Sequence, residues 1–184
     1  MSNRSDAQGT TDDEIYVMTL DENANPVGNP QQITTRPADD IQPAVSPNRT
    51  IAFASKRDGD YEIYVMKAAP ESTTNKPIKL TKNTFADTNP DWSSDGKRIV
   101  FQSERNASEH EIVVMNSDGS GQKLLTNNVF DDIDPVFSLD GRRIAFESTR
   151  STLRDIYRIS ADGANPFNLT SSSAIDANAS WQPN

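Results

Sequence analysis

The strongest constraint on the fold is an internal repeat of about 45 residues, which is clearest between Asp87 and Thr126. The repeat begins with Asp-x-x-Pro and continues through an Asp-Gly turn, an Ile-x-Phe-x-Ser segment, a second Asp-Gly turn and a closing Leu-Thr. The opening aspartates are spaced by 47, 45 and 44 residues, and a closing threonine stands six positions before each of them. These anchors are Asp40, Asp87, Asp132 and Asp176, and Thr34, Thr81, Thr126 and Thr170. Such a period is typical of repeat architectures.

The repeats predict an all-β fold. Each complete copy contains four short apolar segments joined by turn residues, and Asp-Gly pairs favour tight hairpin turns. The middle segments are apolar on both faces of the expected strand, with Ile99 and Phe101 on one face and Val100 on the other. Sheets of this kind must be covered on both sides, as the four-stranded antiparallel blades of a β-propeller are. We therefore predict one propeller domain, or an arc of one, over residues 1–184 with negligible helix.

The copies divide the chain into three complete repeats and one split repeat. The complete repeats span about residues 40–86, 87–131 and 132–175, and the split repeat combines 1–39 with 176–184. In the split copy we expect strands at 14–20 and 31–34, joined by a long connection through the Asn-, Pro- and Gly-containing residues 21–30.

The composition excludes several classes of function. A net charge of -9 without any basic run argues against nucleic-acid binding, which depends on clustered Lys and Arg. The chain has no cysteine, so it can form neither a disulfide nor a thiolate metal site. The polar N-terminus lacks the apolar core of a signal peptide, and no apolar run approaches the roughly 20 residues of a membrane span. We expect a soluble chain that does not insert into a membrane.

The copies resemble the WD40-like PD40 repeats of TolB-type β-propellers. In these repeats Asp-x-x-Pro-x-Trp-Ser-Pro-Asp-Gly is followed by Ile-x-Phe-x-Ser, Glu-Ile-Tyr-Val-Met, Asp-Gly and Leu-Thr, and residues 62–66 match outright. Val45 and Phe137 replace the Trp, Ala179 replaces the Pro, and Asn48 replaces the turn Asp. The resemblance implies a binding scaffold, as in the periplasmic component that docks a lipoprotein or the non-catalytic gates of some peptidases. It also implies a bacterial periplasmic location, and a minority of related propellers are lyases or hydrolases.

The opening aspartates and the residues two positions after them are the candidate binding site. In a propeller the first strand of each blade lines the central channel, so these oxygen-bearing side chains could surround one channel mouth and bind a partner, or calcium. The set comprises Asp40, Asp87, Asp132, Asp176, Gln42, Asn89, Asp134 and Asn178. The alternative is structural, because recurrence in every copy favours aspartates that accept backbone N–H bonds between blades. No metal site is assigned, and no cofactor is expected.

Other residues could bind a ligand or take part in catalysis. Four arginines stand two positions after a recurring Ser and could bind an anion, although recurrence favours pairing with neighbouring aspartates; they are Arg4, Arg57, Arg105 and Arg150. His110 is the only histidine, and we expect it in a loop with no partner beyond Glu109 and Glu111. No Gly-x-Ser-x-Gly motif supports a serine hydrolase. Asp58-Gly59-Asp60 is interpreted as a turn, because it lacks the 12-residue loop of an EF-hand.

We predict a non-enzymatic β-propeller scaffold that binds a protein or peptide partner at the channel. The alternative is a small-ligand or cation-dependent enzyme of the propeller lyase type, which needs a cluster of metal-binding histidines that a single His cannot supply. A purely structural repeat segment is the third possibility. Because the split copy lacks an Ile-x-Phe segment, we expect an arc completed by a second copy of the chain, or part of a longer propeller, with a closed four-bladed monomer as the alternative.

Overall fold

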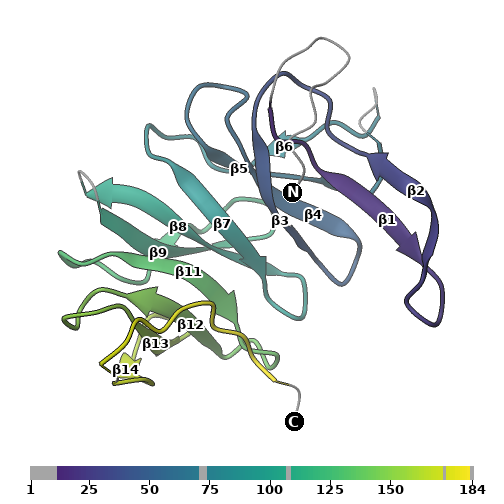
Figure 1. The fold of residues 1–184 in the computed structure, drawn as a ribbon. Coiled ribbons are helices and arrows are strands. Elements are labelled where there is room, and N and C mark those ends of the chain that lie inside the picture. Colours follow the sequence, from purple (N-terminus) through teal and green to yellow (C-terminus); the bar gives the residue numbers. More distant parts are fainter. Residues whose placement is uncertain (1–11, 71–73, 107–108, 172, 183–184) are drawn as a thin grey trace.

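The computed structural model describes residues 12–70, 74–106, 109–171 and 173–182, and all regular structure in these residues is β. Three four-stranded antiparallel sheets stand beside one another, preceded by a two-stranded sheet (Figure 1). Blade 1 contains β3 (Asp40–Val45), β4 (Thr50–Ser55), β5 (Glu62–Lys67) and β6 (Ile78–Lys79). Blade 2 contains β7 (Asp87–Trp92), β8 (Arg98–Asn106), β9 (Glu109–Asn116) and β10 (Lys123–Leu124). Blade 3 contains β11 (Asp132–Phe137), β12 (Arg143–Ser148), β13 (Asp155–Ser160) and β14 (Phe167–Asn168).

The split copy contributes a half-blade of β1 (Tyr16–Leu20) and β2 (Pro26–Gln32) at one end of this row. The C-terminal segment lies against blade 3 at the other end (Figure 1). The all-β propeller prediction is confirmed. Among the described residues no helix is long and apolar enough to cross a bilayer.

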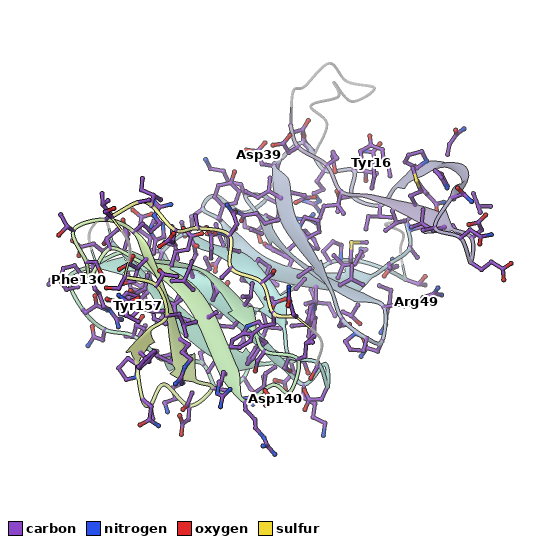
Figure 2. All side chains as sticks on the ribbon, turned by 60° about the horizontal axis from the view of Figure 1, so that its bottom comes forward. Tyr16, Asp39, Arg49, Phe130, Asp140 and Tyr157 are labelled. Carbon is purple, nitrogen blue, oxygen red and sulfur yellow. The ribbon has the colours of Figure 1, made fainter. Side chains whose placement is uncertain are left out.

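Burial on both faces of the middle strands holds the blades together. Phe53, Phe101 and Phe146, one from the Ile-x-Phe segment of each blade, are all fully buried. One apolar cluster joins the half-blade to blade 1, a second joins blades 1 and 2, and a third joins blades 2 and 3. Side chains fill the spaces between neighbouring sheets (Figure 2). The two-sided apolar pattern of the sequence therefore produces the stacking of the blades.

The hairpin after each first strand is closed by a Ser and an acidic or amide side chain. In blade 2 the Ser93 hydroxyl donates to Asp95 at 2.7 Å, the Asp95 carboxylate accepts the N–H of Lys97 at 3.1 Å, and Gly96 has φ +67°. Blade 1 has Asn48 in place of the Asp, and its Oδ1 accepts from the Ser46 hydroxyl at 2.6 Å. The glycine position is taken there by Arg49 with φ +60°, at the tip of the β3–β4 hairpin (Figure 2).

One strand differs from its prediction. Residues 26–30, expected as part of a connection, belong to β2, while the expected strand residues 33 and 34 lie beyond it. The Asp21 carboxylate accepts the N–H groups of Asn23 at 2.9 Å and Asn25 at 2.8 Å, so the turn is complete by residue 25. Pro26 and Pro30 are accommodated because β2 pairs on one side only, with β1, and proline is tolerated in edge strands.

Candidate functional site

The opening aspartates lie inside the blades. Asp40, Asp87 and Asp132 are at most 2% exposed. In blades 2 and 3 the Ser of the Ile-x-Phe-x-Ser segment, Ser103 or Ser148, donates its hydroxyl to the carboxylate. Burial raises the pKa of Asp40 and of Asp87 above the usual range of a carboxyl group. Asp176 is half-buried in the C-terminal segment, where its N–H donates to the carbonyl of Arg154 at 2.8 Å. Among the described residues, the donors to the three blade carboxylates are Ser, Asn and Arg side chains, not the backbone N–H groups that the structural alternative expected.

Two of the recurring arginines pair with these aspartates, as recurrence favours. Arg57 lies 2.8 Å from the carboxylate of Asp40, and Arg150 lies 2.6 Å from that of Asp132. Arg105 donates instead to the hydroxyl of Ser103 at 3.0 Å. Arg4 lies outside the described residues.

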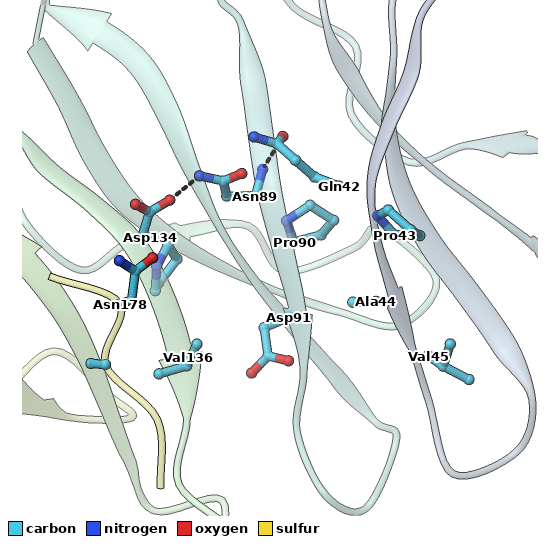
Figure 3. Close-up of a pocket in the computed structure, with 12 residues that line it drawn as sticks. Gln42, Pro43, Ala44, Val45, Asn89, Pro90, Asp91, Asp134, Val136 and Asn178 are labelled. Atoms are coloured by element: carbon cyan, nitrogen blue, oxygen red, sulfur yellow. Dashed lines mark hydrogen bonds between the residues drawn. The ribbon is translucent and has the colours of Figure 1, made fainter. Parts of the chain in front are cut away.

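The residues two positions after the aspartates form the polar rim of a pocket. Gln42, Asn89, Asp134 and Asn178 all have positive φ, between 51° and 58°. In β3, β7 and β11 this conformation coincides with a shift in the pairing register, a β-bulge, between the opening aspartate and the end of the strand. Bulges re-aim side chains, and here they direct Gln42, Asn89 and Asp134 toward the space shared by the first strands (Figure 3). Asn178, from the C-terminal segment, lines the same space.

Hydrogen bonds between neighbouring blades fix this rim. The N–H of Asn89 donates to Gln42 at 3.0 Å, and the Asn89 amide donates to the Asp134 carboxylate (Figure 3). The N–H of Asp134 donates to Gln102 at 2.9 Å, and that of Asn178 donates to Glu147 at 2.6 Å. Gln102 and Glu147 were not among the predicted site residues, although both are polar residues within otherwise apolar Ile-x-Phe-x-Ser segments.

Blade 1 makes the same connection by a different residue. Its counterpart of Gln102 and Glu147 is Ala54, which has no side-chain acceptor. The acceptor for the next blade is supplied by Gln42, which stands in the rim itself. The N–H groups of Asn89, Asp134 and Asn178 are thus satisfied by the preceding blade, and the repeats contain two solutions to the same requirement.

The pocket has a volume of about 480 Å³ and crosses the first strands of all three blades and the C-terminal segment. Pro43 and Pro90 form apolar walls of the pocket (Figure 3), and Pro135 and small apolar residues also line it. Among the lining residues, the charged ones are Asp91 and Asp134, both acidic. The pocket therefore offers apolar surface, hydrogen-bonding amides and negative charge.

Asp91 was not singled out by the sequence, because its counterparts in the other blades are Ala44 and Val136. Its carboxylate accepts the N–H of Phe137 at 2.8 Å, and burial raises its pKa. Burial also raises the pKa of Asp134, helped by the charge of Glu147 and opposed by Arg154 and His110. Both acids are consequently easier to protonate than carboxyl groups in water.

His110 is placed differently from its expected loop position. It lies within β9, and its Nδ1 is 3.1 Å from the carboxylate of Asp131, which also accepts its backbone N–H at 3.0 Å. Although burial alone would raise the pKa of Asp131, the bonds from His110 lower it. The expectation that His110 has no partner beyond its neighbours is therefore wrong, because the partner comes from the connection to blade 3. The part of the chain that the structure describes contains no group of three or more His, Cys, Asp or Glu residues suited to holding a metal ion.

No protein-family model matches the sequence. Solved structures do match, among them a putative TolB from Agrobacterium tumefaciens, with TM-score 0.70 and 24% identity over 88% of this chain and 57% of that one. TolB from Acinetobacter baumannii matches with TM-score 0.71 and 22% identity, over 88% of this chain and 39% of that one. A chain of a nidogen/laminin complex matches with TM-score 0.69 and 13% identity, over 85% of this chain and 58% of that one.

Enzymes also match, including a puromycin-hydrolyzing peptidase and an oligogalacturonate lyase in complex with manganese. At these identities the comparisons show the fold, and they confirm the expected TolB-type propeller architecture. The chain spans less than two thirds of each TolB chain.

Proposed function

We propose that this chain is a non-enzymatic binding scaffold whose channel pocket takes an extended peptide segment of a protein partner. The observation that carries the proposal is the pocket itself, which crosses the first strands of three blades and combines proline walls with an amide-lined rim. Its volume of about 480 Å³ is within the range of common ligand pockets, about 300–1,000 Å³.

The chemistry of the lining suits a peptide. The ring carbons of Pro43, Pro90 and Pro135 offer apolar contact, while the exposed amide of Asn178 can both donate to and accept from a peptide backbone. The rim is fixed by the bonds between blades, so little conformational freedom is lost when a ligand binds.

The structural neighbours support a protein partner. One of them is a chain of a nidogen/laminin complex, and this supports a protein partner for the present fold. The enzyme alternative draws on the lyase solved with manganese. For this chain, the lyase alternative predicts that manganese raises the melting temperature, whereas the scaffold proposal predicts no shift.

Peptide selection on the intact chain tests the proposal. A random peptide library is displayed and selected on the protein, and the affinities of selected peptides are measured by fluorescence polarisation. Pro43→Arg and Asn178→Arg place bulk and charge at two exposed positions in the pocket lining. Ile78→Arg is the control, since Ile78 is also exposed but lies on the outer strand of blade 1.

We expect the two pocket variants to bind selected peptides at least tenfold more weakly, and the control to bind them as the parent chain does. Selection of no peptide, or equal loss in the control, would contradict a peptide-binding channel.

We also propose that the arc is completed by further blades, from a second copy or from a longer chain. Val45 is 64% exposed, whereas Trp92 and Phe137 at the same repeat position are 7% and 6% exposed. In blade 2 the Trp92 indole donates to the carbonyl of Ala44 on the preceding blade at 3.2 Å. Among the described residues, the half-blade before blade 1 has no first strand that could cover Val45 in this way. Light scattering tests association of copies: a mass of twice 20.3 kDa or more supports it, and a 20.3 kDa species rules it out for the isolated chain.

A further inference from the structure

A second pocket, of about 230 Å³, lies on blade 1 away from the channel lining. Its walls carry four cationic side chains and one carboxylate, in a chain whose net charge is -9. The lining consists of Arg36, Arg57, Asp58, Tyr64, Lys76, Pro77 and Lys79. This concentration of positive charge needs an explanation.

Two of the cations are fixed by structural contacts. The Arg57 guanidinium is bonded to Asp40 at 2.8 Å and to the Ser55 hydroxyl at 2.8 Å, and its central carbon lies 5.0 Å from the centroid of the Tyr64 ring. Lys79 lies 3.2 Å from the carboxylate of Glu62 and 3.7 Å from that of Asp58. Arg57 and Lys79 therefore hold fixed positive charges at the base of the pocket, which we call its floor.

The other two cations, Arg36 and Lys76, are exposed and form no salt bridge with any residue that the structure describes. Arg36 stands two residues after a closing Thr, where the other blades have Asn83 and Asn128. Those asparagines donate to the buried opening aspartates at 2.7 and 2.8 Å. In blade 1 Arg57 bonds to Asp40, as Arg150 bonds to Asp132 in blade 3, and no salt bridge joins Arg36 to Asp40. The Arg36 side chain is therefore not part of the bonds around the opening aspartate.

The pocket already accommodates one carboxylate. The Tyr64 hydroxyl donates to Asp58 at 2.5 Å, and this bond, together with the charges of Lys79 and Arg36, lowers the pKa of Asp58. The counterparts of Lys79 in the other blades are Leu124 and Asn168, so this arrangement belongs to blade 1 alone among the three complete blades. The surroundings therefore stabilise an anionic oxygen at this place.

We propose that this pocket binds a compact anionic group, a phosphate or a carboxylate carried by a small molecule. Arg36 and Lys76 would contact the anion directly, Lys79 would contribute charge from the floor, and the Tyr64 ring and Pro77 would border the rest of the ligand. Arginine and lysine are the common ligands of such groups, and neither Arg36 nor Lys76 forms a salt bridge with a described residue, so both have charge available for an anion. The proposal is independent of the channel function.

Titration of the intact ¹⁵N-labelled chain with inorganic phosphate, and separately with citrate, tests the proposal. We expect saturable shifts of the backbone amides at residues 36, 57–58 and 76–79 with at least one of the two anions. Tighter binding of phosphate identifies phosphate esters as the ligand class, and tighter binding of citrate identifies carboxylates.

Arg36→Ala/Lys76→Ala should weaken binding at least tenfold, because it removes both direct contacts without touching a structural bond. Lys97→Ala, which removes an equally exposed charge in the blade 2 hairpin, is the control and should leave the affinity unchanged. Shifts that do not saturate, shifts spread over basic residues of all blades, or an unchanged affinity of the double variant would overturn the proposal.

Discussion

Replacing Gln102 by Ala tests whether side chains of one blade hold the channel rim of the next. The Gln102 side-chain oxygen accepts the N–H of Asp134 at 2.9 Å and the amide of Asn89 at 3.0 Å, and the residue is 7% exposed. Its loss leaves a backbone donor without a partner, which costs about 1–3 kcal/mol. For a chain of this size, about 2 kcal/mol corresponds to a melting temperature lowered by roughly 4–8 °C.

The chain also supplies a rescue. Blade 1 has Ala54 at the position of Gln102 and uses Gln42, at the position of Asn89, as the acceptor. Gln42 has φ 54° and Asn89 has φ 51°, so glutamine fits the backbone of this position. Gln102→Ala/Asn89→Gln should therefore recover at least half of the stability lost in Gln102→Ala.

Urea denaturation followed by tryptophan fluorescence measures both variants, with calorimetry as the second assay. The reasoning requires a lowered midpoint with an unchanged slope for Gln102→Ala. A loss below about 0.5 kcal/mol, which is the usual range of surface substitutions, or a double variant no more stable than the single one, would refute it.

Three further results are expected from the same measurements. Phe101→Ala should lower the free energy of unfolding by about 3–5 kcal/mol, because the ring is fully buried between blades, whereas the exposed Leu139→Ala should change it by less than about 0.5 kcal/mol. Arg49→Gly should stabilise the chain by about 1 kcal/mol, since φ +60° strains a side chain but not glycine; no gain would show that the hairpin tip is unstrained. Burial raises the pKa of Glu14 to about 7, so the folded state holds a proton that the unfolded state releases near pH 4.5. The free energy of unfolding should therefore fall as the pH rises from about 4.5 to 7. Glu14→Gln should flatten this dependence, and an unchanged pH profile of the variant would contradict the reasoning.

The blades could be predicted from the sequence because their determinants are local. The Ile-x-Phe-x-Ser and Glu-Ile-Tyr-Val-Met segments specify strands by residues adjacent in sequence, and Asp95-Gly96 specifies its own turn. The pairing of Arg57 with Asp40 could also be anticipated, since recurrence favoured it. The β2 strand could not, because the turn before it depends on the Asp21 side chain rather than on Pro or Gly.

The candidate site was only half predictable for a physical reason. The residues two positions after each opening aspartate were predicted for their oxygen atoms, and they do line the pocket. β-Bulges in β3, β7 and β11 direct three of them there, and the bulges carry no sequence signal beyond a following Pro. Gln102 and Glu147 act on the next blade, 32 and 31 residues further along the chain. His110 likewise meets Asp131 across a blade boundary. Contacts of this range depend on how the blades stack.

Comparison of the copies within the chain separates residues that build the fold from those available for function. Positions filled alike in every complete blade, such as the opening Asp and the Phe of the middle strand, are buried and bonded within the frame. Some positions at which the copies differ line the two pockets: Asp91 stands where the other blades have Ala44 and Val136, and Arg36 stands where they have Asn83 and Asn128. Asp91 also accepts the N–H of Phe137, so a variant there should change stability as well as the pocket. Arg36 forms no salt bridge with a described residue, so a variant at Arg36 should alter binding far more than stability.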